Sequence, residues 1–200
     1  MEYKFTEHWF GNQDLNIFLD KNGNKLDFLE IGSFEGKSTV WFLENILTHP
    51  DSTITCIDPW TSYSQNTDSF NSYGENGTEW NFNEHKNTFL FNIQLSGFSN
   101  KVKIEHGLST EILPRLITEK KQYDIIFIDG NHTTSFVISD AVMSWYLLKI
   151  GGIMIFDDYI WGQMGTTLAP KLAVDSFVSC FADYLQVIWK DGRLAIKRIK

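Results

Sequence analysis

The sequence of this 200-residue chain is organised around residues 26–38, LDFLEIGSFEGKS. Residues 26–31 are a short and mostly apolar run of the length expected for a buried strand. Gly32 and Gly36 then bracket a tight turn, because glycine lacks a Cβ atom and tolerates positive φ and the close approach of another molecule. The apolar period that follows predicts a helix over residues 39–47. A strand, a glycine turn and a helix in this order present backbone N–H groups and a positive helix end to a ligand.

The details of the turn favour one class of ligand over another. A nicotinamide fingerprint needs G-x-G-x-x-G, because the pyrophosphate lies on bare backbone. Here the pattern is E-x-G-x-x-x-G-x-S, in which Glu30 ends the strand and only two glycines follow. Glu30 can accept a hydrogen bond from an ammonium group, and Ser38 can donate one to a carboxylate. The pattern therefore favours an amino-acid-bearing nucleoside over a dinucleotide, and an ordinary α/β turn is the alternative.

The stretch resembles the S-adenosylmethionine (SAM) loop of class I methyltransferases. Residues 53–57, which are rich in β-branched side chains, predict a second strand that delivers Asp58 to its carboxyl end. Ligands of open α/β sheets bind outside those ends, so Asp58 is placed where both its oxygens can accept from a ribose diol. Pro59 and Trp60 follow and are candidates for the wall of an adenine site.

A second small-residue turn is expected beside the first. Residues 101–105 predict a third strand, and Gly107, Leu108 and Ser109 come shortly after it. In the family that the chain resembles, a turn at this place meets the adenine edge through backbone and serine groups. Ser109 is equally suited to be the N-cap of the next helix, residues 110–118, and the two roles are compatible.

Composition argues against several classes of protein. A formal net charge of -8 and a pI near 5.0 argue against nucleic acid as the main partner, since phosphate binding needs basic patches. Cys56 and Cys180 lie in apolar segments, which predicts reduced core residues of a cytoplasmic protein and neither a disulfide nor a metal pair. No apolar run reaches membrane-spanning length and the acidic N-terminus is no signal peptide, so we expect no membrane partner.

Strands and helices alternate along the chain. We therefore expect an α/β fold with a doubly wound, Rossmann-like sheet of seven strands, mostly parallel with a C-terminal antiparallel hairpin. Residues 1–25 predict an N-terminal helical segment that covers the sheet, contacts substrate or pairs with another subunit, and residues 26–200 the methyltransferase-like domain. Within it, residues 61–83 lack a period and predict a lid or a passive insertion. The other predicted elements are helices over residues 84–98, 134–148 and from Pro170, strands over 123–129 and, after a turn at 150–152, 153–156, and hairpin strands over 185–189 and 194–199.

Three aspartates follow neighbouring strands of this predicted sheet. Asp129 follows the fourth strand, and Asp157 and Asp158 follow the fifth. Carboxylates gathered at one edge repel one another unless a positive charge lies between them, and a hard cation such as Mg2+ or Mn2+ is the simplest choice. Because adjacent residues of a strand point to opposite faces, Asp157 and Asp158 can both bind only if the pleat has already ended. The alternative is that one of them caps a loop.

The arrangement resembles the magnesium-dependent O-methyltransferases, both the catechol type and the macrolide or aminocoumarin sugar type. The sequence FDDY at residues 156–159 is especially similar to the sugar branch. The resemblance covers nearly the whole chain and implies a role for each matching position. It assigns the methionine part of SAM to Glu30, Gly32 and Ser38, the ribose to Asp58, and the adenine to Gly107, Leu108 and Ser109. Ser33, Gly36, Pro59 and Asp129 are further cofactor-binding positions, and the metal is assigned to Asp129, Asp157 and Asp158.

The resemblance places a proton acceptor less firmly. The catechol branch has a lysine three places after its first metal aspartate, and His132 stands at that spacing from Asp129. The sugar branch has an aspartate two places after it, where this chain has Asn131, which cannot take a proton. Histidine suits proton abstraction near neutral pH, so we predict that His132 is the base and acts with Asp129. The alternative is that His132 caps the following helix or supports a metal ligand.

Together these features predict a SAM-dependent O-methyltransferase that acts on a hydroxyl of a small molecule or sugar with a divalent cation. A metal-free methyltransferase of the same fold and a non-catalytic SAM-binding protein are the alternatives. A nicotinamide oxidoreductase would need the absent third glycine. The acceptor is not specified by the sequence, and a homo-oligomer is compatible with it.

Overall fold

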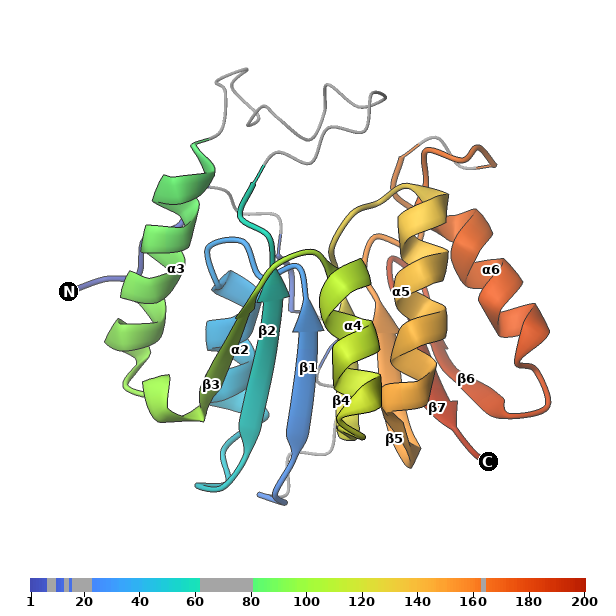
Figure 1. Ribbon diagram of the computed structural model, residues 1–200, viewed down its shortest axis with the longest axis horizontal. Coiled ribbons are helices and arrows are strands. Elements are labelled where there is room, and N and C mark those ends of the chain that lie inside the picture. The colour runs from blue at the N-terminus through green and yellow to red at the C-terminus, as the bar shows by residue number, and fades with distance from the viewer. Residues whose placement is uncertain (7–9, 13–14, 16–22, 62–80, 163–164) are drawn as a thin grey trace.

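The computed structural model describes residues 1–6, 10–12, 15, 23–61, 81–162 and 165–200. Within them, a sheet of seven strands is covered by helices on both faces (Figure 1). The strands are β1 (Asp27–Ile31), β2 (Thr53–Asp58), β3 (Val102–His106), β4 (Tyr123–Ile128), β5 (Leu148–Phe156), β6 (Leu185–Lys190) and β7 (Leu194–Arg198). The helices are α2 (Lys37–Asn45), α3 (Phe82–Ser96), α4 (Ser109–Thr118), α5 (Thr134–Leu147) and α6 (Pro170–Cys180), with a 3-10 turn η2 (Ser99–Lys101).

The strand order is β3-β2-β1-β4-β5-β7-β6. The five strands β1 to β5 are parallel, and β7 runs antiparallel to both of its neighbours. The predicted doubly wound sheet with a C-terminal antiparallel hairpin is therefore confirmed. The carboxyl ends of β1, β2 and β4 lie side by side because these strands are parallel, and the arrowheads of β1 and β2 point to the top of Figure 1.

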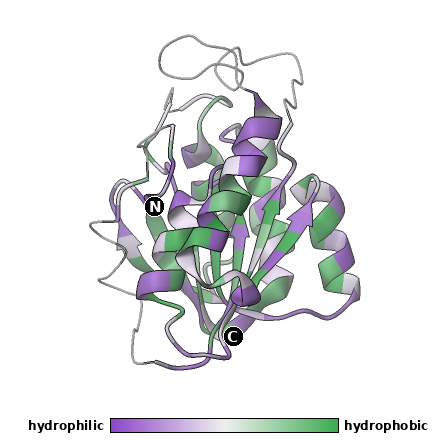
Figure 2. Ribbon diagram, turned by 90° about the vertical axis from the view of Figure 1, so that its left-hand side faces the viewer, coloured by the Kyte–Doolittle hydropathy of each residue, from purple (hydrophilic) through white to green (hydrophobic). Residues whose placement is uncertain are grey.

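Two apolar layers hold the helices to the sheet, and β4 shows how the period of two divides its side chains between them. Ile126 and Ile128 belong to the cluster that packs against α4, α5 and α6. Ile125 and Phe127 belong to the cluster that packs against α2 and α3. Figure 2 shows these apolar segments gathered in the middle of the molecule, with hydrophilic turns of the helices outside.

The sheet departs from prediction where α5 passes into β5. Leu148 already pairs with Tyr123, and the register then jumps so that Ile153 pairs with Ile125. The predicted turn at residues 150–152 is therefore wrong: these residues form an irregular part of the strand. Gly152 is required there, because a Cβ atom at this position would lie 2.9 Å from the carbonyl oxygen of Asp124.

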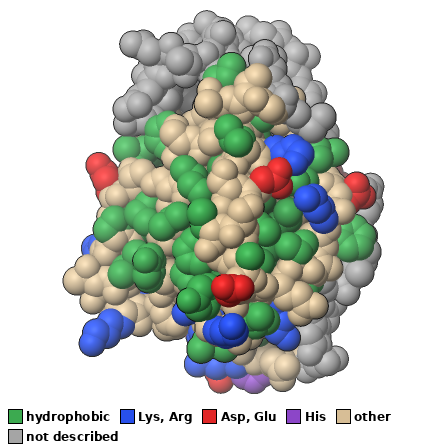
Figure 3. Space-filling view, turned by 90° about the vertical axis from the view of Figure 1, so that its right-hand side faces the viewer, with side chains coloured by type: hydrophobic (Ala, Val, Ile, Leu, Met, Phe, Trp, Pro, Cys, Tyr) green, Lys and Arg blue, Asp and Glu red, His purple; other side chains and the backbone are tan. Residues whose placement is uncertain are grey.

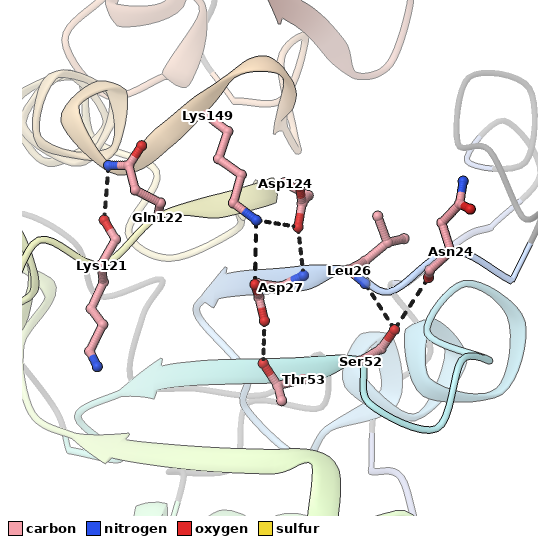
Figure 4. A network of polar contacts seen from close by, with 9 residues as sticks. All are labelled: Asn24, Leu26, Asp27, Ser52, Thr53, Lys121, Gln122, Asp124 and Lys149. Carbon is pink, nitrogen blue, oxygen red and sulfur yellow. Dashed lines mark hydrogen bonds and ion pairs between the residues drawn. The ribbon is translucent and has the colours of Figure 1, made fainter.

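A polar network ties the strands together at the opposite edge of the sheet (Figure 4). The ammonium group of Lys149 lies 2.8 Å from Asp124 and 3.3 Å from Asp27. Asp124 also accepts from the backbone N–H of Asp27, and Asp27 accepts from the hydroxyl of Thr53 at 3.0 Å. The network connects β1, β2, β4 and β5, so the strand ends that lie away from the glycine loop are fixed by side chains.

Several predictions concern segments at the margins of the described chain. Most of the predicted lid, residues 61–83, and about half of the segment 1–25 lie outside the described residues, and residues 1–6 contain no helix. Cys56 is buried as predicted, whereas Cys180 is exposed, so its predicted place in the core is wrong. No helix in the described parts of the chain has the length and apolar character that a membrane span requires.

Apolar side chains also reach the surface on the side that carries α6 and β6 (Figure 3). Leu172, Tyr184 and Val187 are among the exposed ones. The homo-oligomer that the sequence allows stays a prediction.

Candidate active site

The glycine loop between β1 and α2 is built around the fully buried carboxylate of Glu30. This carboxylate accepts hydrogen bonds from the hydroxyls of Ser33 (2.9 Å), Ser38 (2.6 Å) and Thr39. The thiol of Cys56 donates to it at 3.5 Å. Burial raises the pKa of Glu30, and the four donors oppose that shift. The carboxylate expected to accept from a ligand ammonium is thus already satisfied within the chain, and it holds the loop from inside.

Asp58, at the end of β2, binds the backbone of the same loop. Its Oδ2 accepts from the N–H groups of Ser33 and Phe34, both at 2.9 Å, and its Oδ1 accepts from that of Trp60 at 2.7 Å. Burial raises the pKa of Asp58, and these backbone hydrogen bonds oppose the shift. The indole N–H of Trp60 donates to the carbonyl of Phe34 at 2.8 Å, and the ring is buried beneath the loop. Oδ1 of the half-buried Asp58 keeps a lone pair for a further donor.

Gly32 brings this loop into backbone contact with the loop that follows β4. Its φ is +85°, and a Cβ atom here would lie 2.0 Å from the carbonyl oxygen of Asp129. The N–H of Asp129 in turn donates to the carbonyl of Ile31 at 2.8 Å. The need for glycine that the sequence predicts therefore comes from the close approach of the chain's own backbone. Gly36 has a φ of +80° and lies against the ring of Phe89, at the first turn of α2.

The turn after β3 lies beside Asp58, as its place in the sheet predicts. The N–H of Gly107 donates to the carbonyl of Asp58 at 3.1 Å, and a ring nitrogen of His106 lies 3.0 Å from the carbonyl oxygen of Pro59. Ser109 is the first residue of α4, whose N-cap is Leu108. The predicted N-cap role of Ser109 is therefore wrong.

Asp129, His132 and Asp158 converge at the carboxyl edge of the sheet. His132 Nε2 lies 3.0 Å from Asp158 Oδ2 and 3.7 Å from Asp129 Oδ1. One ligand atom from each residue lies within 4.8 Å of the others, which is close enough for all three to reach one metal ion. Asp158 has a φ of +52°, outside the strand conformation, so the pleat has ended before this residue.

The electrostatics of this group follow from its crowding. Burial and the negative charge of Asp157 raise the pKa of Asp129 well above its ordinary value. Burial lowers the pKa of His132, but the adjacent carboxylates of Asp129 and Asp158 outweigh that effect and raise it to about 10. The neighbouring carboxylates therefore favour the protonated imidazole.

Asp157, the third predicted metal ligand, faces Arg193 instead. The guanidinium Nε lies 2.7 Å from Oδ1, and a terminal nitrogen lies 3.2 Å from Oδ2. The N–H of Asp157 donates to the carbonyl of Ile128 at 3.0 Å, so this residue still continues the ladder between β4 and β5. Burial raises the pKa of Asp157, and the charge of Arg193 opposes the shift. Asp157 and Asp158 thus diverge, and only Asp158 joins the group with His132.

Comparison with known proteins agrees with this geometry. Residues 29–159 match a family described as "Methyltransferase domain". The chain belongs to this methyltransferase family. The matched stretch contains the glycine loop, Asp58 and the whole Asp129–His132–Asp158 group, whereas Arg193 lies outside it.

Individual relatives of this chain are distant, and the chain spans less than two thirds of the length of the curated relatives that it matches. It is 31% identical over 162 residues to an uncharacterised protein of Acanthamoeba polyphaga mimivirus, a match that covers 80% of this chain and 64% of that protein. The O-methyltransferase TomG from Streptomyces achromogenes, solved with SAM, superposes with a TM-score of 0.63 at 17% identity over 87% of this chain and 73% of TomG. The mycinamycin-pathway methyltransferase MycE, solved with Mg and S-adenosylhomocysteine, gives 0.61 at 12% identity over 98% of this chain and 51% of MycE. These superpositions show the shared fold.

Two further residues in or next to this candidate site escaped prediction. The ring centroid of Trp161 lies 4.8 Å from that of His132. The backbone N–H of Trp161 donates to the carbonyl of Asp158 at 2.9 Å. Its side chain is 40% exposed, so it forms an open aromatic wall beside the group. Asp140, on α5, is buried behind Ser109 and Gly130, and burial raises its pKa to about 7 against a hydrogen bond from Ser109. The apolar period of α5 gave no signal for a buried carboxylate.

Proposed function

We propose that this protein is a SAM-dependent O-methyltransferase that acts on a hydroxyl group of a small molecule or sugar with the help of a divalent cation. The observation that carries the proposal is the convergence of Asp129, His132 and Asp158 at the strand ends. This group is in backbone contact with a glycine loop of the methyltransferase family through Gly32.

The cofactor is proposed to lie along the glycine loop and the turn after β3. The backbone of the loop from Ser33 to Gly36 and the first turn of α2 at Ser38 are suited to the methionine part of SAM, while the hydroxyls of Ser33 and Ser38 stay bound to Glu30. Asp58, Pro59 and the turn formed by Gly107, Leu108 and Ser109 flank the expected place of the nucleoside. We assign Glu30 to support of the loop, since four donors of the chain already surround its carboxylate.

Two carboxylates and an imidazole fit a divalent cation, and we propose that Asp129 and Asp158 hold it. When bound, Mg2+ or Mn2+ would lower the pKa of the acceptor hydroxyl and position its oxygen for attack on the methyl carbon. We assign Asp157 to its ion pair with Arg193 rather than to direct metal binding.

His132 remains the proposed base, and the metal-free pKa of about 10 sets a condition on that role. The shift arises from the charges of Asp129 and Asp158, so Nε2 can accept a proton at neutral pH only when those charges are compensated. Binding of a cation by the two carboxylates and proton acceptance by His132 are therefore linked. Trp161 packs against the imidazole and limits its rotation.

Calorimetry of the parent protein and three variants tests the proposal. S-adenosylhomocysteine, the demethylated product, should bind the parent protein, and NAD should not. Asp129→Asn should abolish Mn2+ binding, whereas Asp157→Asn, the matched aspartate, should retain it. His132→Ala should also retain Mn2+ binding but slow methyl transfer in single-turnover assays by about 100-fold, the usual scale for loss of a general base.

The methyl-transfer assays use catechols and sugars as acceptors. Each alternative function then gives a different result. If His132→Ala loses Mn2+ binding as completely as Asp129→Asn, His132 is a ligand and not the base. Full turnover in excess chelator would identify a metal-free methyltransferase. Binding of S-adenosylhomocysteine without transfer to any acceptor would favour a non-catalytic SAM-binding protein.

A further inference from the structure

Glu35, in the middle of the glycine loop, binds residues far from it in the sequence. Its side chain is 2% exposed. Oε2 accepts from the backbone N–H of Thr6 at 2.6 Å, and Oε1 accepts from the Thr6 hydroxyl at 3.0 Å. Oε1 also lies 2.8 Å from Nδ1 of His85, on α3. One buried carboxylate therefore joins the glycine loop, the N-terminal segment and a helix.

Asn92, on α3, makes a second connection between the same segments. Its side chain is fully buried. Oδ1 accepts from the N–H of Lys4 at 2.9 Å, and Nδ2 donates to the carbonyl of Lys4 at 2.7 Å. Nδ2 also donates to the backbone carbonyl of Glu35 at 2.9 Å. The amide thus satisfies both backbone groups of Lys4 and holds the glycine loop at the same time.

The two sides of the glycine loop are held by different residues. Asp58 binds the N–H groups of Ser33 and Phe34, next to the turn proposed for the nucleoside. The next residue of the loop is Glu35, whose backbone carbonyl accepts from Asn92 and whose side chain accepts from Thr6. Asn92 also binds Lys4, so the two side chains connect this part of the loop to residues 4–6. Because both side chains are buried, neither is available to contact a ligand directly.

We infer that residues 4–6 form an N-terminal clasp on the glycine loop, and that Glu35 and Asn92 are positioning residues for SAM binding. The inference rests on the proposed function, because it takes the glycine loop as the SAM site. Lys4 and Thr6 are exposed residues, so loss of either side chain would let water replace the hydrogen bonds that hold residues 4–6, which favours release of the segment. If contact of residues 4–6 with the loop raises the affinity for SAM by some factor, bound SAM must stabilise that contact by the same factor, because the two equilibria are linked.

Hydrogen exchange of the parent protein tests this reciprocity without any substitution. The amides of Lys4 and Thr6 donate to Asn92 and Glu35, so saturating S-adenosylhomocysteine should slow their exchange by about threefold or more. The amide of Ile199, which donates to the carbonyl of Tyr184 in the C-terminal hairpin region, should not change and is the internal control.

Substitutions test the same inference through affinity. Glu35→Ala and Asn92→Ala should each weaken binding of S-adenosylhomocysteine by about 10-fold or more, because each removes a buried side chain that makes several hydrogen bonds between the glycine loop and residues 4–6. The KM for SAM should rise by a similar factor, while kcat at saturating SAM stays within about twofold. Glu35→Gln keeps an acceptor for Thr6 and should recover part of the affinity. Tyr3→Phe, which removes only an exposed hydrogen bond to Glu44, should bind like the parent protein.

The outcomes separate this inference from the proposed function. If the parent protein binds S-adenosylhomocysteine but the amides of Lys4 and Thr6 exchange at the same rate with and without it, the clasp does not support the cofactor site. Folded alanine variants that bind with parental affinity would overturn the inference in the same way. Failure of the parent protein to bind would contradict the proposed function and remove the basis of the clasp with it.

Discussion

Replacement of Asp140 by asparagine should change how the stability of this protein depends on pH. Burial raises the pKa of Asp140 from 3.8 to about 7, so the folded chain holds this proton more tightly than the unfolded chain does. The contribution of Asp140 to the free energy of unfolding should therefore be largest below about pH 4 and be lost as the pH rises through about 7. A shift of about three pKa units corresponds to a loss of about 4 kcal/mol, and asparagine, which does not ionise, avoids it.

Urea unfolding of both proteins between about pH 4 and 8 measures this difference. The Asp140→Asn variant should match the parent protein to within about 1 kcal/mol near pH 4 and exceed it by up to about 4 kcal/mol at pH 8. The raised pKa values of Asp58 and Asp129 affect both proteins equally and cancel in the difference. Asp51→Asn, at an exposed turn, is the control and should give a curve parallel to that of the parent. If the difference between Asp140→Asn and the parent does not change with pH, the reasoning from burial is refuted.

Two further substitutions test contacts that position the site. Gly32→Ala should lower the free energy of unfolding by about 3 kcal/mol, since its Cβ atom would overlap the Asp129 carbonyl. Gly97→Ala, at a similar φ but in open space, is the control and should cost only about 1 kcal/mol. Equal losses in urea unfolding would show that the protein relieves the overlap at little cost. Arg193→Met should destabilise the protein by about 3 kcal/mol at neutral pH, because the buried charge of Asp157 loses its partner. The double variant with Asp157→Asn should recover most of that loss. If the free-energy losses of the two single variants simply add in the double variant, the pairing is contradicted.

The parts of the fold that the sequence predicts are those in which local pattern and tertiary structure agree. The apolar run that ends at Ile31, the two glycines after it and the helix that follows all lie where the period and turn chemistry place them. The prediction of a turn at residues 150–152 failed because Gly151 and Gly152 are typical of a turn, whereas here they occupy a bulged part of β5.

The site residues that prediction missed depend on contacts between distant parts of the chain. Arg193 reaches Asp157 only because β7 inserts beside β5, and no spacing along the sequence encodes that ion pair. Asp140 was hidden among the apolar residues of α5, where a period of 3.6 predicts burial but not the chemistry of the buried group. Asp158 was predicted at the right place, but its separation from Asp157 depends on a left-handed backbone that only the structure reveals.

The contact between Gly32 and Asp129 also matters for protein engineering. The two loops meet through main-chain atoms, so replacing an exposed side chain nearby leaves this contact in place. Under the proposed function, libraries that vary the exposed residues Ile160 and Trp161 should therefore change which acceptors are methylated without shifting the glycine loop against the loop that follows β4. A measured change in acceptor range at unchanged affinity for S-adenosylhomocysteine would show that the two loops keep their relative position when the exposed residues are redesigned.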